Sequence, residues 1–375
     1  MLRRGPFRPG AFRSAVHEPR AAVVLGRWLG AALLVCFATG LVSHLLQDPP
    51  GWLTGRQPSR PVAGYRFTQG LHVAAGLAAI PLTGAKLWTV YPRLFEWPPA
   101  RSVRHLLERL AVALLVAAVL LELFSGLLNT LQWYPWPFPF RQTHYWTAWT
   151  AVGALLVHLA VKAPVIAAHW RRAVAVPLAG RRALLTATAT AVGAVTLTTA
   201  GQSVPWLRAL DLFAPRRPGS GSVPGGSGLP VNRTAAQAGT TVVPADWQLA
   251  VDGPKGFRID LAGLRALPQT TADLPIACVE GWSANGRWTG VRLADLLRRA
   301  GVPAGSAVRI TSLEAAGPYR VTELPARHAD DPLTLLALAL DGRPLTPDHG
   351  FPARLVAPNR PGVLQTKWVA RIEVV

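Results

Sequence analysis

Cysteine is nearly absent from this chain of 375 residues, which carries only Cys36 and Cys278. Cys36 falls inside a long apolar run, whereas Cys278 lies in a mixed, polar segment toward the other end of the chain. A disulfide between them is not expected, and a fold held by a framework of disulfides is excluded. Cys278 is therefore either a free thiol or a metal ligand.

Acidic residues and lysine are also scarce. The chain has 19 Asp and Glu against 39 Lys and Arg, a formal net charge of +20, and almost all of its basic residues are arginine. Such a charge is compatible with nucleic-acid binding, but the arginines gather beside apolar runs, as membrane topology requires. We expect a membrane as the partner, and no nucleic acid.

Long apolar runs are confined to the first 200 residues. Five of them are long enough to cross a ~30 Å hydrocarbon layer, which takes roughly 20 residues: 22–46, 67–90, 106–131, 144–168 and 183–200. Arginines are denser before the first run, between the second and third, and between the fourth and fifth. By the positive-inside rule the N-terminus is cytoplasmic, and five crossings place the C-terminal part outside the cell membrane.

Composition divides the chain into five segments. These are a cytoplasmic N-terminal segment (1–21), a four-helix membrane domain (22–170), a fifth transmembrane helix (171–200), a linker (201–243) and a folded domain (244–375). The linker is rich in Gly, Pro and Ser and predicts a flexible tether. The last segment contains short strand-like runs, a hairpin signal at Asp341-Gly342 and an amphipathic helix, VRLADLLRRAGV, that Gly301 would end. The predicted fold class is a multi-domain chain, an all-α transmembrane bundle of five helices followed by an α+β domain.

The fifth apolar run has a particular pattern, GRRALLTATATAVGAVTLTTAGQS. Paired Arg181 and Arg182 precede a mildly apolar core rich in Ala and Thr, which is the pattern of a twin-arginine export signal. Such a signal would carry an already folded, cofactor-loaded domain across the membrane. Ordinary positive-inside anchoring remains the alternative.

Histidines within the apolar runs are candidate functional residues, because an ionisable group is costly inside a membrane. His144 and His158 are fourteen residues apart in the fourth run. On a helix they differ in depth by ~21 Å and lie about 40° apart around the axis, which suits two stacked haems. His72 matches His144 in depth, with His44 as a spare, and His17 is the candidate partner for His158. Histidines that only hydrogen-bond neighbouring helices are the alternative.

The four-helix pattern, with two histidines on its fourth helix, resembles the prokaryotic cytochrome b membrane subunits over residues 17–170. The resemblance implies haem b, one or two groups, and electron exchange with the quinone pool. The sequence departs from that family in one respect, since the first run has no histidine well inside it near its cytoplasmic end. The missing histidine is a ligand that the inner haem, the one nearer the cytoplasm, would need.

Two segments carry a second resemblance, CVEGWSANGRWTGVRLADLL and LDGRPLTPDHGFPARLVAPNRPGVLQTKWVARIEVV. From about residue 250 onward the chain resembles the sulfite-oxidase-type molybdopterin domain, including its methionine-sulfoxide reductase branch. The resemblance implies that Cys278 is the catalytic thiolate bound to molybdenum, and that His349, Arg354 and Lys367 hold the pterin and its phosphate. A soft thiolate suits a sulfur-bound metal, and cationic donors suit a phosphorylated cofactor.

Other residues near these motifs are weaker candidates. Asn359, Arg360 and Gln365 are candidates for further cofactor contacts, and a second set would line the substrate pocket: Tyr319, Arg320, Arg287 and Glu280. Three tryptophans are expected in the core rather than against the cofactor: Trp282, Trp288 and Trp368.

The sequence as a whole predicts a membrane-anchored molybdopterin-dependent oxidoreductase. Oxygen-atom transfer outside the membrane would be coupled to the quinone pool through haem b, with a small oxo compound as substrate and sulfoxide reduction as the first guess. Only about thirty-five folded residues precede Cys278, which makes sulfite itself a doubtful substrate. The alternative is a non-catalytic, membrane-anchored binding module with a degenerate cofactor domain and structural histidines.

Overall fold

The computed structural model describes residues 15–17, 19–96, 98, 100–170, 179–201, 204–212 and 228–375. They form two compact units. The first contains Met1–Ala38, Leu71–Ala200 and Leu210–Pro215, and the second contains Thr39–Gly70, Gly201–Ala209 and Arg216–Val375. The boundary does not follow the helix ends, since the segment that joins the first two helices belongs to the second unit.

Four long helices make up most of the first half of the chain: α1 (Pro19–Gln47), α2 (Gly64–Val90), α3 (Val103–Thr130) and α4 (Phe140–Trp170). Each is long and apolar enough to cross a membrane. Their outward faces expose large apolar side chains, which a lipid phase would cover without cost: Leu34, Leu107, Leu120 and Leu156.

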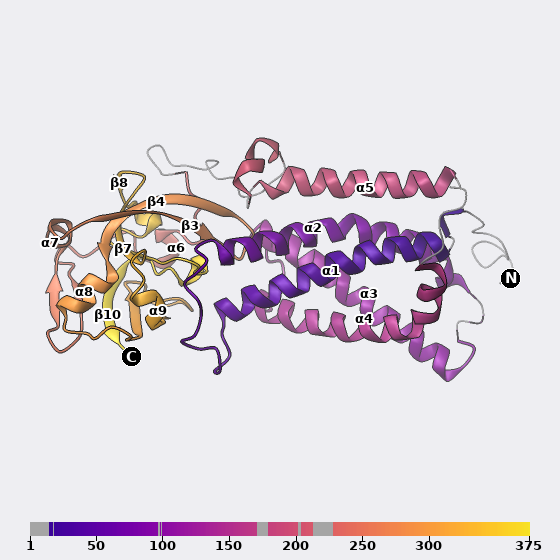
Figure 1. The fold of residues 1–375 in the computed structure, drawn as a ribbon, viewed down its shortest axis with the longest axis horizontal. Helices are drawn as coiled ribbons and strands as arrows, with labels where there is room; N and C mark the ends of the chain where they lie inside the picture. Colours follow the sequence, from indigo (N-terminus) through magenta and orange to yellow (C-terminus); the bar gives the residue numbers. More distant parts are fainter. Residues whose placement is uncertain are drawn as a thin grey trace. The chain divides into compact units, whose positions relative to one another are not determined.

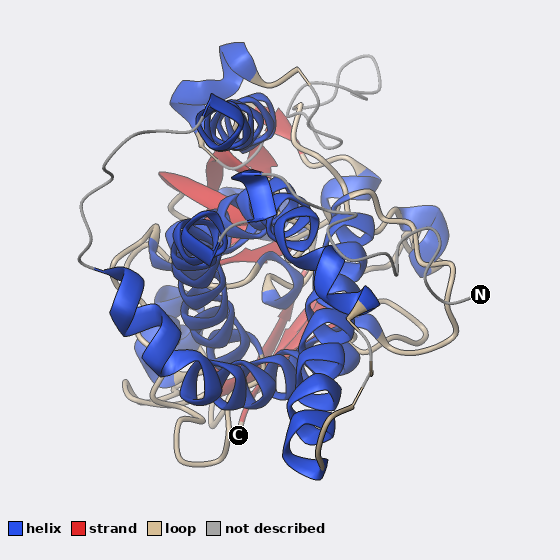
Figure 2. Ribbon diagram, turned by 90° about the vertical axis from the view of Figure 1, so that its right-hand side faces the viewer, coloured by secondary structure: helices blue, strands red, loops and turns tan. Residues whose placement is uncertain are grey.

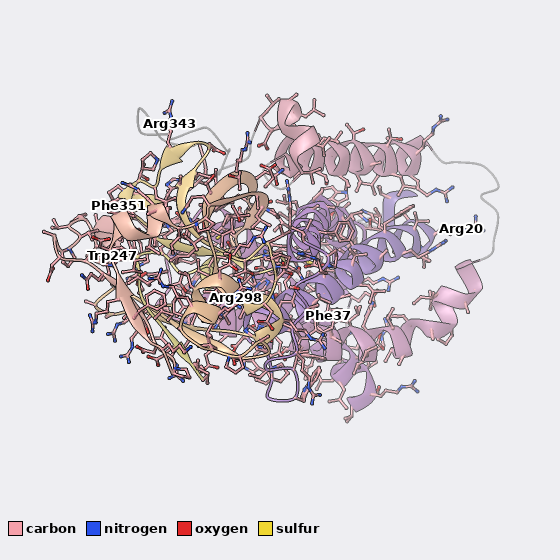
Figure 3. The ribbon with its side chains drawn as sticks, turned by 60° about the vertical axis from the view of Figure 1, so that its left-hand side comes forward. Arg20, Phe37, Trp247, Arg298, Arg343 and Phe351 are labelled. Carbon is pink, nitrogen blue, oxygen red and sulfur yellow. The ribbon has the colours of Figure 1, made fainter. Side chains whose placement is uncertain are left out.

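Within the first unit these helices lie side by side (Figures 1 and 2). Phe37 of α1 meets Trp149 of α4 edge to face, with 5.0 Å between ring centroids (Figure 3). Ser102 begins α3 as its N-cap and accepts a hydrogen bond from the backbone N–H of His105. The bundle therefore has the predicted helices, each extended by a few residues beyond the apolar run that predicted it.

A fifth helix, α5 (Ala179–Ala200), also forms. It covers the predicted run 183–200, but by length and hydropathy four of the described helices qualify as membrane spans, and α5 is not one of them. Its Ala- and Thr-rich sequence lowers its hydropathy below that of α1 to α4. Five membrane helices are thus not confirmed, and the paired Arg181 and Arg182 lie in the first turn of α5.

The C-terminal part of the chain contains two sheets. The first has the strand order β2-β1-β10-β5-β6, with β1 (Leu249–Val251), β2 (Phe257–Ile259), β5 (Val308–Ser312), β6 (Val321–Leu324) and β10 (Val369–Val374). Only the β1–β10 pair is parallel. The chain's last strand therefore lies at the centre of this sheet.

The second sheet has the order β3-β4-β7-β8, with β9 also pairing with β7. Its strands are β3 (Thr270–Ala277), β4 (Ser283–Arg292), β7 (Leu335–Leu340), β8 (Arg343–Pro344) and β9 (Arg354–Val356). The predicted hairpin is present, because Asp341 and Gly342 join β7 to β8 with φ values of 51° and 77°, the left-handed backbone of a type I′ turn. The β3–β4 hairpin, which is the longest in the domain, was not among the strands that sequence patterns predicted.

Short helices complete the α+β domain: α6 (Ala235–Ala238), α7 (Leu261–Ala266), α8 (Leu293–Arg299) and α9 (Ala326–Ala329). The predicted amphipathic helix is α8, and Gly301 follows it with φ 74°. One buried cluster packs α8 against the first sheet, and another surrounds Cys278 and Trp288 on the second sheet.

The flexible linker was predicted to run from 201 to 243, but its last part, from residue 229 onward, packs into the folded domain. Leu229 packs into the buried cluster around Cys278, and α6 buries Ala235 and Ala238 against Trp368. Thr234 and Gln237 form a capping box at the start of α6. Residues 229–243 are thus part of the folded domain, because they have apolar side chains to bury that the Gly- and Ser-rich stretch before them lacks.

Candidate functional site

Cys278 directly follows β3, in the turn that connects it to β4. The turn is closed by two backbone hydrogen bonds, from Cys278 N–H to the Trp282 carbonyl (2.9 Å) and from Gly281 N–H to the Cys278 carbonyl (3.1 Å). Gly281 has φ 83°, a conformation that glycine adopts without strain. Cys278 is 1 % exposed, and it faces a cavity.

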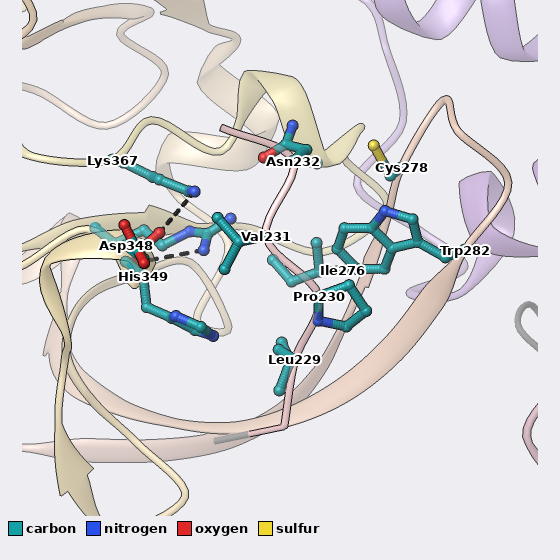
Figure 4. Close-up of a pocket in the computed structure, with 12 residues that line it drawn as sticks. Leu229, Pro230, Val231, Asn232, Ile276, Cys278, Trp282, Asp348, His349 and Lys367 are labelled. Carbon is teal, nitrogen blue, oxygen red and sulfur yellow. Dashed lines mark hydrogen bonds between the residues drawn. The ribbon is translucent and has the colours of Figure 1, made fainter. Parts of the chain in front are cut away.

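The cavity is lined by all four residues that the sequence predicted for the pterin site: Cys278, His349, Arg354 and Lys367. His349 ends a short 3-10 helix (Pro347–His349), Arg354 begins β9, and Lys367 lies just before β10. Figure 4 shows the thiol, His349 and the Lys367 ammonium around the same space. The fold therefore brings residues from distant parts of the chain to one site.

Backbone carbonyls hold the two cations of the cavity. The Lys367 ammonium donates to the carbonyls of Arg233 (2.9 Å) and Asp348 (2.8 Å). The Arg354 guanidinium lies 5.3 Å above the Trp288 ring and donates to the His349 carbonyl at 3.4 Å. Its Nε is buried and has no hydrogen-bond partner among the described residues. An orphaned, buried N–H of this kind is a donor that an anionic ligand would satisfy.

Burial sets the protonation states of these groups. It raises the pKa of the Cys278 thiol well above its usual range, so the thiol stays protonated unless a metal displaces the proton. Burial, and then the charges of Arg354 and Lys367, lower the pKa of His349 to about 4, so this imidazole is neutral at pH 7. Burial and the charge of Arg354 lower the pKa of Lys367 to about 7. The two cations outnumber the one carboxylate among the lining residues, that of Asp348.

No group of three or more His, Cys, Asp or Glu side chains is arranged to hold a metal ion in the part of the chain that the structure describes. A metal bound at Cys278 would therefore need its other ligands from a cofactor. The residues present fit a cofactor that has sulfur ligands for a metal and a phosphate for the cations. Gly350 has φ 104°, and a Cβ there would lie 3.1 Å from Lys367 Cβ and 3.2 Å from Arg354 Cβ, so the close approach of these two cations depends on glycine.

Sequence patterns missed part of the cavity wall. The segment Leu229, Pro230, Val231 and Asn232 lines the cavity, as do Asp348 and Trp282. The Asp348 carboxylate accepts a hydrogen bond from Ala235 N–H at 2.8 Å, which fastens this segment to the domain. The capping-box pattern of Thr234 and Gln237 was the available signal that folded structure begins before residue 244.

Several weaker candidates have other roles. Arg360 donates to the carbonyls of Leu364 and Glu323, Gln365 donates to the Arg360 carbonyl, and neither lines the cavity. The residues predicted for the substrate pocket also do not line the cavity at Cys278: Tyr319, Arg320, Arg287 and Glu280. Trp288 and Trp368 are core residues, with 0 % and 1 % exposed surface, whereas Trp282 both packs in the core and lines the cavity.

A second polar site lies in the helix bundle. The rings of His72 in α2 and His144 in α4 are 6.1 Å apart between centroids and nearly perpendicular, at 82°. His72 Nδ1 lies 2.8 Å from the Cys36 carbonyl, and His144 Nδ1 lies 3.1 Å from the Glu122 carboxylate. Because both Nδ1 atoms contact oxygen atoms of the protein, a metal ion would bind these histidines through their Nε2 atoms.

The other predicted haem histidines do not form a comparable pair. His17 Nδ1 lies 3.2 Å from the Thr89 carbonyl, and its ring packs edge to face on Tyr91. His158 Nδ1 is buried without a hydrogen-bond partner among the described residues, and His44 lies in the last turn of α1. Two histidine pairs were predicted, His72 with His144 and His17 with His158. The structure brings the rings of His72 and His144 together.

Lys367 makes the stability of the cofactor-free protein depend on pH. We expect the melting temperature of wild type to rise relative to that of Lys367→Met between pH 7 and about 10. In the unfolded chain Lys367 keeps its ordinary pKa of about 10.4 and holds a proton over this range. In the folded chain its pKa is about 7, so the proton is lost. The unfolded state then binds more protons than the folded state, so the stability of wild type rises with pH. Below pH 7 both states hold the proton, and the difference in melting temperature between wild type and Lys367→Met is constant. Thermal melts of both proteins in detergent, without cofactor, measure this difference in melting temperature. A difference that does not change from pH 7 to 10 would contradict the prediction.

Comparison with known proteins assigns the domain that contains the cavity. Residues 236–375 match a protein-family model described as "Oxidoreductase molybdopterin binding domain". The chain is 32% identical over 158 residues to the mitochondrial sulfite oxidase of Drosophila melanogaster, an alignment that covers 35% of this chain and 27% of that protein. It is 31% identical over 158 residues to the catalytic subunit MsrP of the protein-methionine-sulfoxide reductase of Burkholderia mallei, over 38% of this chain and 47% of that one.

A third relative is the putative protein-methionine-sulfoxide reductase subunit YedZ1 of Azospira oryzae, 32% identical over 130 residues, which covers 32% of this chain and 48% of that protein. The chain therefore spans about half the length, or less, of these three relatives. The match to the family model covers residues 236–375, the part that holds Cys278, Arg354 and Lys367.

Proposed function

The C-terminal part of this chain is a molybdopterin-binding oxidoreductase domain of the type found in sulfite oxidases and MsrP, and we propose that it acts as the catalytic domain of a membrane-anchored oxygen-atom-transfer enzyme. The observation that carries the proposal is the cavity at Cys278, where one buried thiol faces buried cations. The chain supplies one soft ligand and a positive pocket, and the cofactor would supply the remaining sulfur ligands and the phosphate.

In this proposal each residue has a defined task. Cys278 would hold the metal as a thiolate, since a bound metal keeps a thiol deprotonated. Arg354 and Lys367 would bind the phosphate of the pterin, and the Arg354 Nε, which has no partner among the described residues, would be a further donor for it. His349 remains neutral and donates or accepts a hydrogen bond to the pterin without adding charge. The cofactor supplies oxygen-atom transfer, in which a sulfoxide takes up two electrons and two protons and yields the corresponding sulfide and one water molecule.

A small sulfoxide is the substrate class that we propose first. Two of the relatives have methionine-sulfoxide reductase in their names, and the electron supply of a membrane-anchored chain suits reduction. Purified protein should contain about one molybdenum per chain and oxidise a reduced dye in the presence of a sulfoxide. If it contains no molybdenum after maturation in a cofactor-producing host, the non-catalytic binding module becomes the better account.

We further propose that electrons reach the site from the quinone pool through haem b held by His72 and His144. The two imidazoles lie close together, with 6.1 Å between ring centroids, and histidine is a usual protein ligand of haem iron. The Nδ1 contacts to the Cys36 carbonyl and to Glu122 are of the kind that orient ligand histidines. For the inner haem there is no such support, so we propose one haem rather than two.

The proposed topology has the N-terminus inside and the catalytic domain outside. Arg60, between α1 and α2, pairs with Asp331 of the catalytic domain at 3.0 Å, which supports a topology with the α1–α2 connection and this domain on the same side of the membrane. Four crossings would return the chain to the N-terminal side. If α5 also crosses the membrane, the catalytic domain lies on the same side as Arg60 and can form the Arg60–Asp331 pair. This argument favours an α5 that spans the membrane despite its lower hydropathy.

The twin-arginine proposal for α5 predicts a strict requirement for arginine. Replacing Arg181 and Arg182 together by lysine should strand the catalytic domain in the cytoplasm, because both changes keep the positive charge and alter only the side chain that the export machinery would read. Protease protection in intact spheroplasts measures this. The control is Arg298→Lys with Arg299→Lys, a pair within α8, which should leave export unchanged. A cofactor-loaded, protease-accessible domain in the Arg181/Arg182 variant would leave ordinary anchoring as the explanation.

A further inference from the structure

The connection between α1 and α2 packs against the catalytic domain. Residues 39–70 belong to the same compact unit as that domain, and Val62 packs against the buried cluster that contains Cys278. We call residues 58–69 the docking segment. Its contacts with the domain are polar and specific, and Asn359 makes three of them.

Asn359 serves as an N-cap for α2 from a distant part of the chain. Its Oδ1 accepts from the backbone N–H of Tyr65 at 2.6 Å, and its Nδ2 donates to the Pro58 carbonyl at 2.8 Å. Its backbone N–H donates to the Val62 carbonyl at 3.0 Å. The first N–H groups of a helix need acceptors, which a Ser, Thr, Asp or Asn just before the helix usually supplies. Ala63 occupies that position here and has no acceptor in its side chain.

The conformation of Asn359 suits this role. The residue has φ 52° and is 6 % exposed, and asparagine tolerates the left-handed region better than most residues. Both polar groups of its side chain are used by the docking segment. The sequence suggested a cofactor contact for this residue, but it does not line the cavity.

Three further contacts extend the surface around Asn359. The Arg60 guanidinium pairs with Asp331, whose side chain is 5 % exposed, and Arg66 donates to the Asn285 side chain at 2.6 Å. Gln69, which is buried, donates to the Val279 carbonyl at 3.2 Å. Val279 is the residue after Cys278, so this last bond attaches the docking segment to the turn that carries the proposed metal ligand.

We propose that this surface is an intramolecular docking site, by which the α1–α2 connection holds the catalytic domain to the membrane part independently of the covalent linker and steadies the Cys278 turn. The partner is the chain's own docking segment, recognised by Asn359, Asp331, Asn285 and the Val279 carbonyl. Gln69 and His72 both belong to α2, one helical turn apart, so the helix that carries the proposed haem ligand is also the helix that holds the turn. The docking inference goes beyond the proposed function and depends on neither cofactor.

Cutting the linker tests the docking directly. A protease site in place of residues 218–223 of the full chain allows the linker to be cleaved in purified membranes. We expect the cleaved catalytic domain to remain with the membranes after sedimentation, because the docking segment still holds it. Release of the wild-type domain into the supernatant upon cleavage would overturn the proposal.

A glycine in the docking segment provides a variant that leaves the catalytic domain unchanged. A Cβ on Gly64 would lie 2.7 Å from Asn359 Oδ1, whereas a Cβ on Gly51 meets nothing within 4 Å. Gly64→Val should therefore speed release after cleavage by roughly ten-fold or more, the factor that corresponds to about 1.4 kcal/mol. Gly51→Val is the matched control and should be retained as wild type is. Equal retention of both variants would overturn the proposal.

Cross-linking gives a second measurement, which reports proximity rather than retention on the membrane. Arg66→Cys with Asn285→Cys, treated with a short bis-maleimide before linker cleavage, should yield fragments that stay joined on a denaturing gel. Arg66→Cys with Arg258→Cys is the control, because Arg258 lies in β2 of the other sheet, and its fragments should separate. If both pairs cross-link equally, or neither does, the docking segment does not occupy this surface.

Discussion

Replacing Cys278 by serine should abolish turnover while leaving the protein folded. We expect a fall of about 10³-fold or more, which equals about 4 kcal/mol or more in activation free energy. A serine hydroxyl is a harder ligand than a thiolate and stays protonated at neutral pH, so the proposed metal would lose the ligand that we assign to Cys278. Sulfoxide-dependent oxidation of a reduced dye measures the effect.

Two controls separate the loss of a ligand from the loss of the fold. The turn at 278–282 is closed by backbone hydrogen bonds that serine leaves in place, so the melting temperature of Cys278→Ser should stay close to that of wild type. Ala304→Ser, an exposed change in a turn outside the cavity, should keep full activity. Unchanged turnover in Cys278→Ser would remove this residue as the metal ligand, even if the protein contains molybdenum.

Replacing either His72 or His144 by alanine should remove the b-type absorbance of the purified protein. Both histidines are proposed ligands of one haem, so the loss of either imidazole should weaken haem binding severely. The reduced-minus-oxidised spectrum and the haem content per chain measure the result. Molybdenum content should not change, because the cofactor cavity is lined only by residues of the C-terminal domain.

Two other histidines act as controls for this prediction. His105 lies in the first turn of α3, where its backbone N–H is capped by Ser102, and His105→Ala should keep the haem. His158→Ala should also keep it if one haem is bound, as we propose. Haem that persists in both His72→Ala and His144→Ala would show that the pair is structural, and loss in His158→Ala would point to a second haem.

Local chemistry explains which parts of this protein were predictable. The helices α1 to α4 follow from uninterrupted apolar runs, since a lipid phase requires every backbone group to be bonded within the helix. The β7–β8 hairpin follows from Asp341-Gly342, because few other dipeptides adopt that turn without strain. Cys278, Arg354 and Lys367 were predicted from the resemblance to the molybdopterin domain, and the structure places them around one cavity.

The parts that were missed depend on partners far away in the sequence. In this hairpin β3 pairs with β4, and β4 lies between β3 and β7, which comes later in the chain. The local sequence therefore does not show what the hairpin packs against. Residues 229–232 resemble the linker in composition, and only the cavity that they line gives them a role. The pairing of His72 with His144 was expected from depth along the helices, whereas the partner proposed for His158 had no such support.

The sequence by itself predicted a membrane half and a cofactor-binding half, and it named a thiol and cations that line one cavity in the structure, because hydropathy and donor chemistry are properties of single residues and short segments. Only the tertiary structure decided that Asn359 caps a helix 294 positions away in the chain and that Leu229–Asn232 close the cavity. Such roles depend on which surfaces meet in space. A side chain's own chemistry does not specify its neighbour.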